Sequence, residues 1–535
     1  MSSTHETSLE TRQEAHFGDR VVRCFVERRA DTFGVFERAV ARWPAAEALV
    51  AGRVRMTYRD LHGIVERLAA ALHRRGLGAG DRVGVLLGNR PEFVIGILAA
   101  LRLGAVAVPI GTRLAAAEVR YILDHCEARV IMYDDEAAGA VAAIDGMSDL
   151  LAAVRCGGAD GGISFGDLEL GGPLATGRLA PGEEDTAFLL YTSGTTGRPK
   201  GAMLTHLNVW HSLKHFELAH RLGADERSLL AVPATHVTGL VAIILSMINV
   251  GGTILLFPVF KARDFLELAA RERMTHTVLV PAMYNLLLRE PQRTAHDLSH
   301  WRLGSYGGAP MPEAAIVALG EWLPHLSLVN GYGATETTSP TSLTPIGEGL
   351  ARRETVGKPV HCAEVIVVDD AGCEVARDAA GEIWIRGPMV VPGYWRDPQA
   401  TSASFTAGFW HSGDIGSLDG EGYLRLIDRK KDMINRGGYK IYSVEVENVL
   451  AEFPGVFECA VVAKACPVLG ERVHAYVSRT TPEISAESIS RFCASRLADY
   501  KVPETFTLMD HPLPRSSAGK VLKRVLREQL MEIVS

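Results

Sequence analysis

Residues 191–201 combine side chains and glycines that could hold a phosphate group. The stretch reads Tyr-Thr-Ser-Gly-Thr-Thr-Gly-Arg-Pro-Lys-Gly, with four serine or threonine hydroxyls, three glycines and the cation Lys200. Glycines let a backbone approach a ligand closely and turn its N–H groups inward, as phosphate cradles do. Hydroxyls add neutral donors, and lysine adds a mobile positive charge. We expect a phosphate-binding loop rather than a flexible surface loop. The P-loop pattern Gly-x-x-x-x-Gly-Lys-[Ser/Thr] does not fit it.

Four later segments, residues 330–336, 410–414, 427–434 and 514–524, carry charged side chains that could serve the same chemistry. Each has an ordinary explanation when it is taken alone. Thr335-Glu336 is typical of a helix N-terminus, and Gly-Asp at 413–414 is typical of a turn. The charged run at 428–432 is typical of a solvated linker, and the basic run near the end is typical of a solvated helix end. The order in which the segments follow one another along one chain favours a shared function over these separate explanations.

The five segments together resemble the signature motifs of the acyl-adenylate-forming superfamily. That superfamily includes acyl-CoA synthetases, luciferases and the adenylation domains of peptide synthetases. The resemblance runs in the expected order from Phe33 to Arg524, and residues 80–85, 89–92 and 104–109 are similar to the family's amino-terminal scaffold. It implies that ATP activates a carboxylic acid as an acyl-adenylate, which then passes its acyl group to a thiol.

The resemblance also implies a role for particular residues. It places Tyr332 on the adenine ring, Thr335 on the α-phosphate, Glu336 on Mg²⁺, Asp414 on the ribose hydroxyls and Arg429 on the ribose. The implied nucleotide-binding residues are Thr192, Ser193, Gly194, Thr195, Thr196, Gly197, Lys200, Gly308, Ala309, Pro310, Asn330, Gly331, Tyr332, Asp414 and Arg429. The implied catalytic residues are Lys520, Thr335, Glu336 and His236. Asn330 and Ala334 differ mildly from the commonest family residues.

An acyl pocket is implied on the same grounds, with His236 at its mouth. Its expected lining is His236, Thr238, Gly239, Tyr306, Gly307, Gly333, Ser339 and Pro340. Because none of these positions is Lys, Arg, Asp or Glu, an acid whose side chain carries no charge is favoured over an amino acid. Fatty acids and aryl or arylalkanoic acids both stay open. For His236 a buried core histidine is an equally weighted alternative.

The thiol half-reaction rests on a second glycine segment. Gly437, Gly438 and Lys440 resemble the loop that faces the pantetheine channel of coenzyme A, and Lys431 occupies the hinge position. ATP, Mg²⁺ and coenzyme A are therefore the expected cofactor and co-substrates. A stand-alone enzyme that loads a carrier-protein phosphopantetheine is the first alternative. A luciferase-like oxygenase and a non-catalytic binding module are the others.

Length and composition bound the elements that must position these residues. A chain of 535 residues and 57.9 kDa exceeds what one core usually supports, so we expect at least two domains. The expected division is an extension over 1–30, loosely attached, an AMP-binding domain over 31–428, a hinge at 429–431 and a lid domain over 432–535. A net charge of -7 with no basic stripe gives no sign of nucleic-acid binding.

Strand-like and helix-like runs alternate in the first domain, which predicts βαβ units in parallel sheets. The expected strands are 83–87, 105–109, 130–133, 254–257 and 277–280, and the expected helices are 58–72, 92–103 and 115–125. Short strands after 355 predict a small barrel-like part, and the last 100 residues predict an α+β domain. His211, His215 and His220 are expected on the surface of a helix that starts near Asn208.

The remaining features point to an enzyme of a reducing compartment. Residues 237–260 hold no charge but contain Gly251-Gly252 and Pro258, so a buried helix, turn and strand fit better than a membrane span. The eight cysteines show no CxxC spacing, which argues against zinc. The start of the chain lacks the pattern of a signal peptide. We expect a cytoplasmic protein with small-molecule partners and leave a homodimer open.

Overall fold

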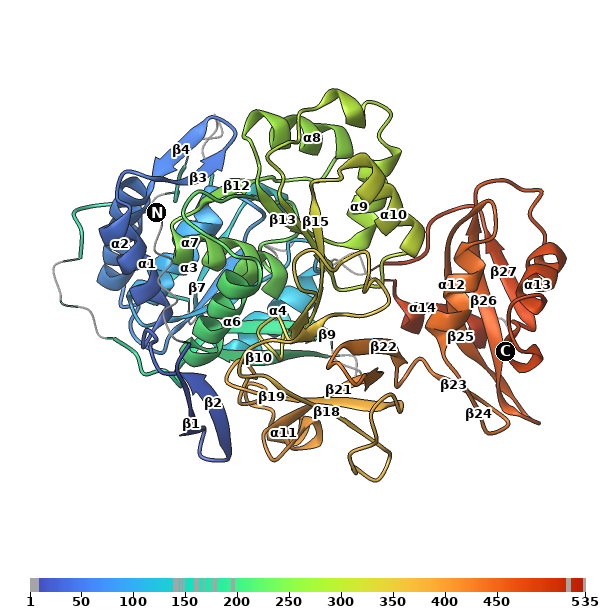
Figure 1. Cartoon of the computed structure of the whole chain (residues 1–535). Coiled ribbons are helices and arrows are strands. Elements are labelled where there is room, and N and C mark those ends of the chain that lie inside the picture. The colour runs from blue at the N-terminus through green and yellow to red at the C-terminus, as the bar shows by residue number, and fades with distance from the viewer. Residues whose placement is uncertain are drawn as a thin grey trace. The chain divides into compact units, whose positions relative to one another are not determined.

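The computed structural model describes residues 9–137, 144, 147, 150–157, 163–166, 168, 170–174, 177, 180–193, 198–515 and 521–532. The chain divides into two compact units; Figure 1 labels their helices and strands. The large unit is Met1–Val365 with Ile385–Trp410, and the small unit is Ile366–Trp384 with His411–Ser535.

The first sheet of the large unit has six strands in the order β10-β9-β6-β5-β7-β8. All neighbours pair in parallel except β9 and β10, which form an antiparallel hairpin. The strands are β5 (Arg82–Leu86), β6 (Val106–Pro109), β7 (Ala128–Tyr133), β8 (Ala152–Arg155), β9 (Thr186–Ser193) and β10 (Pro199–Thr205). The order is not the chain order, so the parallel strands need crossover connections.

The second sheet has nine strands in the order β17-β16-β15-β14-β13-β11-β12-β3-β4. Its centre, from β15 to β3, is parallel, and β4, β16 and β17 add antiparallel edges. The strands are β3 (Glu47–Ala51), β4 (Val54–Thr57), β11 (Arg227–Leu230), β12 (Thr253–Leu256), β13 (His276–Leu279), β14 (Leu303–Gly307), β15 (Ser327–Tyr332), β16 (Ser342–Leu343) and β17 (Lys358–Pro359).

Helices fill the space between the two sheets and cover their outer faces. Apolar side chains of α1, α2, α3, α6 and α7 share one core with inward residues of both sheets. α8, α9 and α10 pack on the far face of the nine-stranded sheet, and α4 packs on the far face of the six-stranded sheet. The helices are α1 (Thr32–Arg42), α2 (Tyr58–Arg74), α3 (Pro91–Arg102), α4 (Ala116–Cys126), α6 (His206–Ala219), α7 (Ser246–Val250), α8 (Ala262–Arg271), α9 (Pro281–Arg289), α10 (Glu313–Trp322) and α11 (Pro398–Ser404).

The predicted α/β architecture is confirmed, and the predicted strands and helices of the first domain agree closely with the observed ones. α2 begins after Thr57, whose side chain and that of Asp60 form a reciprocal capping box. The run at 237–260 folds as the expected buried helix, turn and strand. Its first part, Thr238–Leu245, is a π-helix, and Gly251 ends the following helix in the left-handed region. Among the described residues, no helix is long and apolar enough to cross a membrane.

The expectation that α6 exposes its histidines is wrong. His211 and His220 are fully buried, and His215 is 2% exposed. α6 packs against the core between the two sheets, and its partly exposed positions are held by other residues, among them Lys214 and Glu217. Burial lowers the pKa of His211 and of His220 to about 3, and it lowers the pKa of His215 well below its ordinary value. These residues are therefore neutral members of the core.

The amino-terminal extension is also packed more firmly than expected over its described part. β1 (Thr11–His16) and β2 (Arg20–Phe25) form an antiparallel hairpin. Phe25 is 3% exposed, and its N–H donates to Nε2 of His211. Arg20 donates to the carbonyls of Val391 and Pro392. Side chains buried at this contact hold the hairpin against the rest of the large unit.

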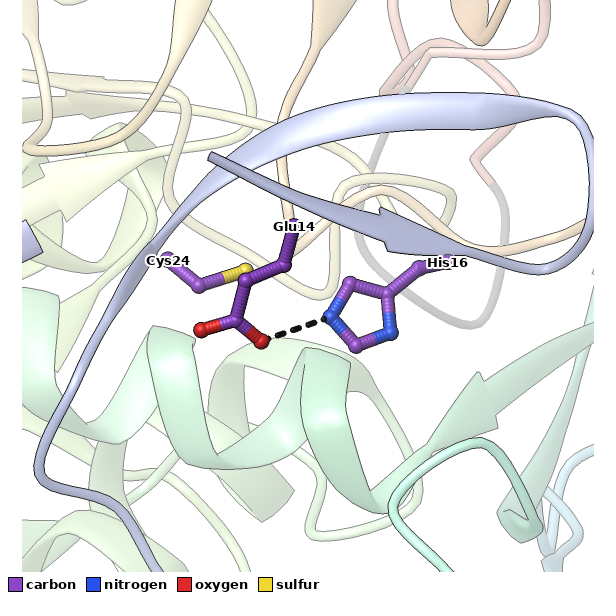
Figure 2. A group of neighbouring side chains, drawn as sticks. All are labelled: Glu14, His16 and Cys24. Atoms are coloured by element: carbon purple, nitrogen blue, oxygen red, sulfur yellow. Dashed lines mark hydrogen bonds and ion pairs between the residues drawn. The ribbon is translucent and has the colours of Figure 1, made fainter. Parts of the chain in front are cut away.

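Three side chains of this hairpin, Glu14, His16 and Cys24, lie close enough together to suggest a metal site (Figure 2). Their surroundings favour an ion-pair network instead. Arg28 donates to both oxygens of Glu14, and it holds the pKa of that carboxyl at about 2. Burial raises the pKa of the Cys24 thiol to about 12. A cation would meet the Arg28 guanidinium and a neutral thiol, so the network acts as a structural anchor.

A five-stranded sheet follows the nine-stranded one along the chain, in the order β18-β19-β21-β20 with β22 beside β21. These strands are β18 (Glu364–Val368), β19 (Gly381–Arg386), β20 (Phe405–Thr406), β21 (Phe409–Leu418) and β22 (Leu424–Arg429).

The last part of the small unit is a sheet with helices on both faces. Neighbouring residues of β25 point to opposite sides: Val461 packs with α12 and α13, and Val462 packs with α14. The sheet order is β24-β23-β26-β25 with β27 beside β26. The elements are β23 (Ile434–Arg436), β24 (Tyr439–Ile441), α12 (Ser443–Ala451), β25 (Val456–Cys466), β26 (Gly470–Arg479), α13 (Ala486–Ala494), β27 (Thr505–Met509) and α14 (Lys523–Glu532).

Candidate active site

The carboxyl ends of three parallel strands, β11, β14 and β15, carry many of the expected site residues of the large unit. β14 and β15 are neighbours with Tyr306 beside Asn330 and Gly307 beside Gly331. β13 separates β14 from β11, and the loop after β11 holds His236. Ligands of open α/β sheets bind at such carboxyl ends. The fold therefore brings the expected adenine and acyl-pocket segments to one edge of one sheet.

The backbones of β14 and β15 approach each other closely at that edge. A Cβ built on Gly307 would lie 2.4 Å from the carbonyl oxygen of Gly331. The next residue, Gly308, has a φ of +79°, which a residue with a side chain rarely adopts. Gly308, Ala309 and Pro310 are exposed, and Tyr332 is 8% exposed. A flat ring could therefore lie against the exposed 308–310 backbone.

Gly307→Ala is expected to lower stability by about 1–3 kcal/mol, because the new methyl group meets backbone that cannot move away. It should also weaken ATP binding, because the adenine segment follows directly. Thermal unfolding and equilibrium titration with ATP measure the two effects. Gly320→Ala is the matched control, since its Cβ in α10 meets nothing within 4 Å and alanine favours a helix. Wild-type stability in Gly307→Ala would contradict the close approach.

The turn that carries Thr335 and Glu336 is held by its own side chains and backbone. The amide of Ala334 donates to Oγ1 of Thr337 over 2.9 Å, and the amide of Ser339 donates to the carbonyl of Ala334 over 3.0 Å. Thr338 and Ser339 both have positive φ, at 52° and 58°. Such conformations in non-glycine residues cost energy and cluster at functional sites.

The expected phosphate loop is the tip of the β9–β10 hairpin. Lys200 on β10 pairs with Thr192 on β9, and both are partly exposed. β10 itself was not predicted, because Pro199, Lys200 and Gly201 indicate a loop when only the sequence is considered. Four loop residues lie outside the described residues, and so does the side chain of Ser193; the four are Gly194, Thr195, Thr196 and Gly197.

Tyr394 connects the hairpin to the Glu336 turn, and sequence reasoning missed it. Its hydroxyl donates to Oε1 of Glu336 over 2.9 Å, and Nζ of Lys200 lies 5.1 Å from the centre of its ring. Glu336 is 8% exposed and Tyr394 is 7% exposed. The only sequence signal was the aromatic pair Tyr394-Trp395 after a glycine, which is unremarkable without the fold.

The remaining acyl-pocket residues take two different environments. His236 and Thr238 are partly exposed, so His236 is not sealed in the core. Gly239 is buried, and a Cβ there would lie 2.3 Å from the carbonyl oxygen of Pro233, so the loop folds tightly on itself. Gly333 is exposed, whereas Tyr306 and Pro340 are buried. Thr238, Gly239 and Tyr306 lie at the sheet edge described above.

In the small unit, Asp414 and Arg429 face each other across β21 and β22. They are register partners, and Nε of Arg429 lies 3.4 Å from Oδ1 of Asp414. The side chain of Asp414 is 15% exposed, and that of Arg429 is 51% exposed. The amide of Asp414 donates to Oγ of Ser412, which fixes the backbone at this point. A carboxylate, which accepts hydrogen bonds only, suits the hydroxyl groups of a ribose.

The turn at the expected hinge is anchored to the last helix. Asp428 accepts hydrogen bonds from the amide and the hydroxyl of Ser443, and Lys523 donates to that hydroxyl over 2.7 Å. Lys523 also pairs with Glu447, whose pKa is raised by burial. Arg527 pairs with Asp432 and donates to the carbonyl of Lys431. Asp428 is thus connected through Ser443 to Lys523, the first residue of α14, and Asp432 is connected to Arg527 of the same helix.

The expected coenzyme A loop is a tight hairpin between β23 and β24. Gly437 and Gly438 have φ values of 58° and 92°, as a two-residue hairpin turn requires. The turn itself therefore favours glycine at both positions, in addition to the close approach of a ligand that the motif suggests. Lys440 is exposed, and its Nζ lies 3.3 Å from Oδ2 of Asp370. Lys520 lies outside the described residues.

Comparison with known proteins places these features in a family. The family model described as AMP-binding enzyme matches residues 36–395, and the model described as AMP-binding enzyme C-terminal domain matches residues 445–520. The chain belongs to the AMP-binding enzyme family. The resemblance drawn from the motifs is thereby confirmed.

Relatives within this family are named as CoA ligases of different acids. A long-chain-fatty-acid–CoA ligase of Mycobacterium tuberculosis is 35% identical over 89% of this chain and 93% of that protein. A feruloyl-CoA synthase of Amycolatopsis sp is 36% identical over 91% and 96%. O-succinylbenzoate coenzyme A synthetase of Bacillus subtilis, solved in complex with ATP and magnesium ion, matches with a TM-score of 0.83 and 29% identity over 94% of this chain and 100% of that chain.

Proposed function

We propose that this enzyme is an ATP-dependent acyl-CoA ligase. It joins a carboxylic acid to AMP with release of pyrophosphate and then transfers the acyl group to coenzyme A with release of AMP. The observation that carries the proposal is the Lys200–Tyr394–Glu336 contact, which connects a phosphate-loop cation to an expected Mg²⁺ ligand. The names of the relatives support the same chemistry.

In the first half-reaction a carboxylate oxygen of the acid bonds to the α-phosphorus of ATP. The bond from that phosphorus to the bridging oxygen breaks, and pyrophosphate leaves. Lys200 and the hairpin hydroxyls hold the triphosphate, and Lys520 supplies the cation shared by the two reacting anions. Such catalysis consists mainly of positioning and charge stabilisation. Asp414 and Arg429 hold the ribose.

Magnesium fits the oxygen donors that this site offers. Glu336 supplies a carboxylate, and Thr335 supplies a hydroxyl beside it; Mg²⁺ prefers hard oxygen ligands of this kind. Glu336 is the residue that would hold the ion. When bound, the ion supplies positive charge that offsets the charge of the triphosphate.

In the second half-reaction the thiol sulfur of coenzyme A bonds to the acyl carbon. The bond between that carbon and the AMP oxygen breaks, the thiol proton is lost, and AMP leaves. Gly437, Gly438 and Lys440 present the loop that faces the thiol arm. Rotation of the 432–535 domain about Lys431, the hinge of the 429–431 segment, exchanges Lys520 for this loop and keeps the mixed anhydride away from water.

Lys431→Pro is expected to slow thioester formation by about tenfold or more while leaving adenylation nearly intact, because proline fixes φ at the pivot. Among the described residues, no backbone hydrogen bond of this turn uses the Lys431 amide, so proline removes no such donor there. Single-turnover assays of each half-reaction measure the effect, with Lys431→Ala, which removes the side chain but leaves φ free, as the control. A defect confined to adenylation would contradict the hinge assignment.

The acid has no charged group besides its reacting carboxylate and is a fatty acid or an aryl or arylalkanoic acid. The expected pocket positions hold no charged side chain, and the named relatives include both classes. A panel of such acids, with hydroxylamine trapping the acyl-adenylate as hydroxamate, tests the proposal. Hydroxamate formation with one class and acyl-CoA formation from the same acid support it. No hydroxamate from any acid, or transfer to a carrier protein alone, would count against it.

A further inference from the structure

Tyr394 belongs to a segment that lies along the open edge of β10. The amide of Trp395 donates to the carbonyl of Gly201 over 2.7 Å, and the amide of Met203 donates to the carbonyl of Gly393 over 3.1 Å. Tyr394 itself forms a bridge with Ala202. β10 is the last strand of the six-stranded sheet, so these bonds fix the segment against the strand that carries Lys200.

Further contacts fix both the backbone and the ring of Tyr394. Its amide donates to Oγ1 of Thr401 over 3.0 Å, and the Thr401 hydroxyl donates to the carbonyl of Asp397 over 2.8 Å. The ring packs edge-on against Phe405 at 6.1 Å between centroids. The amide of Val391 donates to the carbonyl of Glu336 over 2.9 Å. The same segment therefore fixes both the tyrosine and the backbone of its acidic partner.

The two functional groups of Tyr394 serve two different partners. The hydroxyl donates to Oε1 of Glu336, and the ring face lies 5.1 Å from Nζ of Lys200. A hydrogen bond to one carboxylate oxygen sets the orientation of the other oxygen. A ring face stabilises an ammonium by about 0.5–1 kcal/mol at a partly exposed site. A phenylalanine would pack as well as tyrosine, so packing alone does not account for the hydroxyl.

We propose that Tyr394 is a positioning residue of the adenylation site: its hydroxyl orients Glu336 toward the magnesium ion of the nucleotide, and its ring holds Lys200 at the phosphate loop. This role rests on the proposed function. Residues that orient a metal ligand commonly change metal affinity or activity by about 10- to 100-fold when they are replaced.

Tyr394→Phe and Tyr394→Leu separate the hydroxyl from the ring. The readout is equilibrium binding of α,β-methylene-ATP, which cannot be cleaved at the α-phosphorus, over a series of Mg²⁺ concentrations. Tyr394→Phe is expected to raise the Mg²⁺ concentration for half-maximal binding by about tenfold and to leave binding without Mg²⁺ unchanged. Tyr394→Leu should also weaken binding without Mg²⁺ by about two- to fivefold, because Lys200 loses the ring face.

Tyr58→Phe is the matched control, because Tyr58 is a fully buried tyrosine whose hydroxyl donates to the carbonyls of Met247 and Gly252. It should lower the melting temperature without changing the Mg²⁺ dependence. In a Glu336→Gln background the effect of Tyr394→Phe on Mg²⁺ dependence should vanish. A wild-type Mg²⁺ dependence in Tyr394→Phe, or a shift that persists without Glu336, would overturn the role.

ATP–pyrophosphate exchange by the wild-type chain separates this role from the proposed function. Exchange with an acid, together with a normal Mg²⁺ dependence in Tyr394→Phe, removes the role of Tyr394 and leaves the ligase assignment standing. Absence of exchange with every acid overturns the proposed function, and the role of Tyr394 falls with it.

Discussion

Replacing Lys520 by alanine is expected to lower acid-dependent ATP–pyrophosphate exchange by at least about 10²–10³-fold. The reaction brings the acid's carboxylate against a phosphate, and a positioned cation at this point stabilises the transition state more than the ground state. Thioester formation from a supplied acyl-adenylate should stay near the wild-type rate. The two half-reactions are measured separately, with the purified acyl-adenylate added for the second.

Arg524→Ala is the matched control for Lys520→Ala. It removes a neighbouring cation whose side chain is 69% exposed and pairs with Glu528 one helical turn away. Exchange should stay within about twofold of wild type, since such surface pairs contribute little. An equal loss of both half-reactions in Lys520→Ala would contradict the division of labour between the two steps.

Mild acid is expected to unfold the large unit because four histidines are buried as neutral groups. Burial lowers the pKa of His211 and His220 to about 3 and lowers the pKa of His215 and His276 well below its ordinary value. The unfolded chain therefore binds more protons below about pH 6.5, and stability falls as the pH falls from there toward 3. His211 and His220 each account for about 2 kcal/mol by pH 5, and His215 and His276 act in the same direction. A loss of this size is a large fraction of the stability of many proteins.

The melting temperature of the large unit, followed from pH 7.5 to pH 5, measures this effect. Glu14 and its ion pair act in a different window, because the pKa of that carboxyl is lowered to about 2 and its contribution persists until the pH falls below about 4.5. His511→Gln, which removes an exposed histidine, should leave the profile unchanged. A melting temperature that is constant down to pH 5 would show that the four histidines are not held neutral.

The sequence predicted elements well wherever side-chain periodicity decides the structure. The alternation from β5 through α3, β6 and α4 to β7 shows in the apolar pattern, and Thr57 marks the start of α2. The expectation for α6 is wrong because its histidines lie on the part of the helix that the core between the two sheets buries, while Lys214 and Glu217 occupy its partly exposed side. Burial by that core is a property of the tertiary fold, so no local pattern in α6 reports it.

The candidate site shows the same contrast between residues that local sequence patterns reveal and residues that only the tertiary fold brings together. The motifs supplied Lys200, Glu336, Asp414 and Arg429 because each carries a charge at a recognisable spacing. Tyr394 could not be found, because its function depends on a segment that reaches the edge of β10 from almost 200 residues away along the chain. The positive φ angles of Thr338 and Ser339 were equally invisible, since threonine and serine carry no signal for that conformation.

Product analysis with a reactive acid, ATP, Mg²⁺ and coenzyme A is the direct test of the proposed two-step ligation. Acyl-CoA, AMP and pyrophosphate are quantified together by mass spectrometry and enzymatic assay. An AMP-forming ligase yields equal amounts of the three products and, when coenzyme A is withheld, pyrophosphate release limited to about one equivalent of enzyme. Formation of ADP and phosphate, or acyl transfer without AMP, would contradict the proposed ligation.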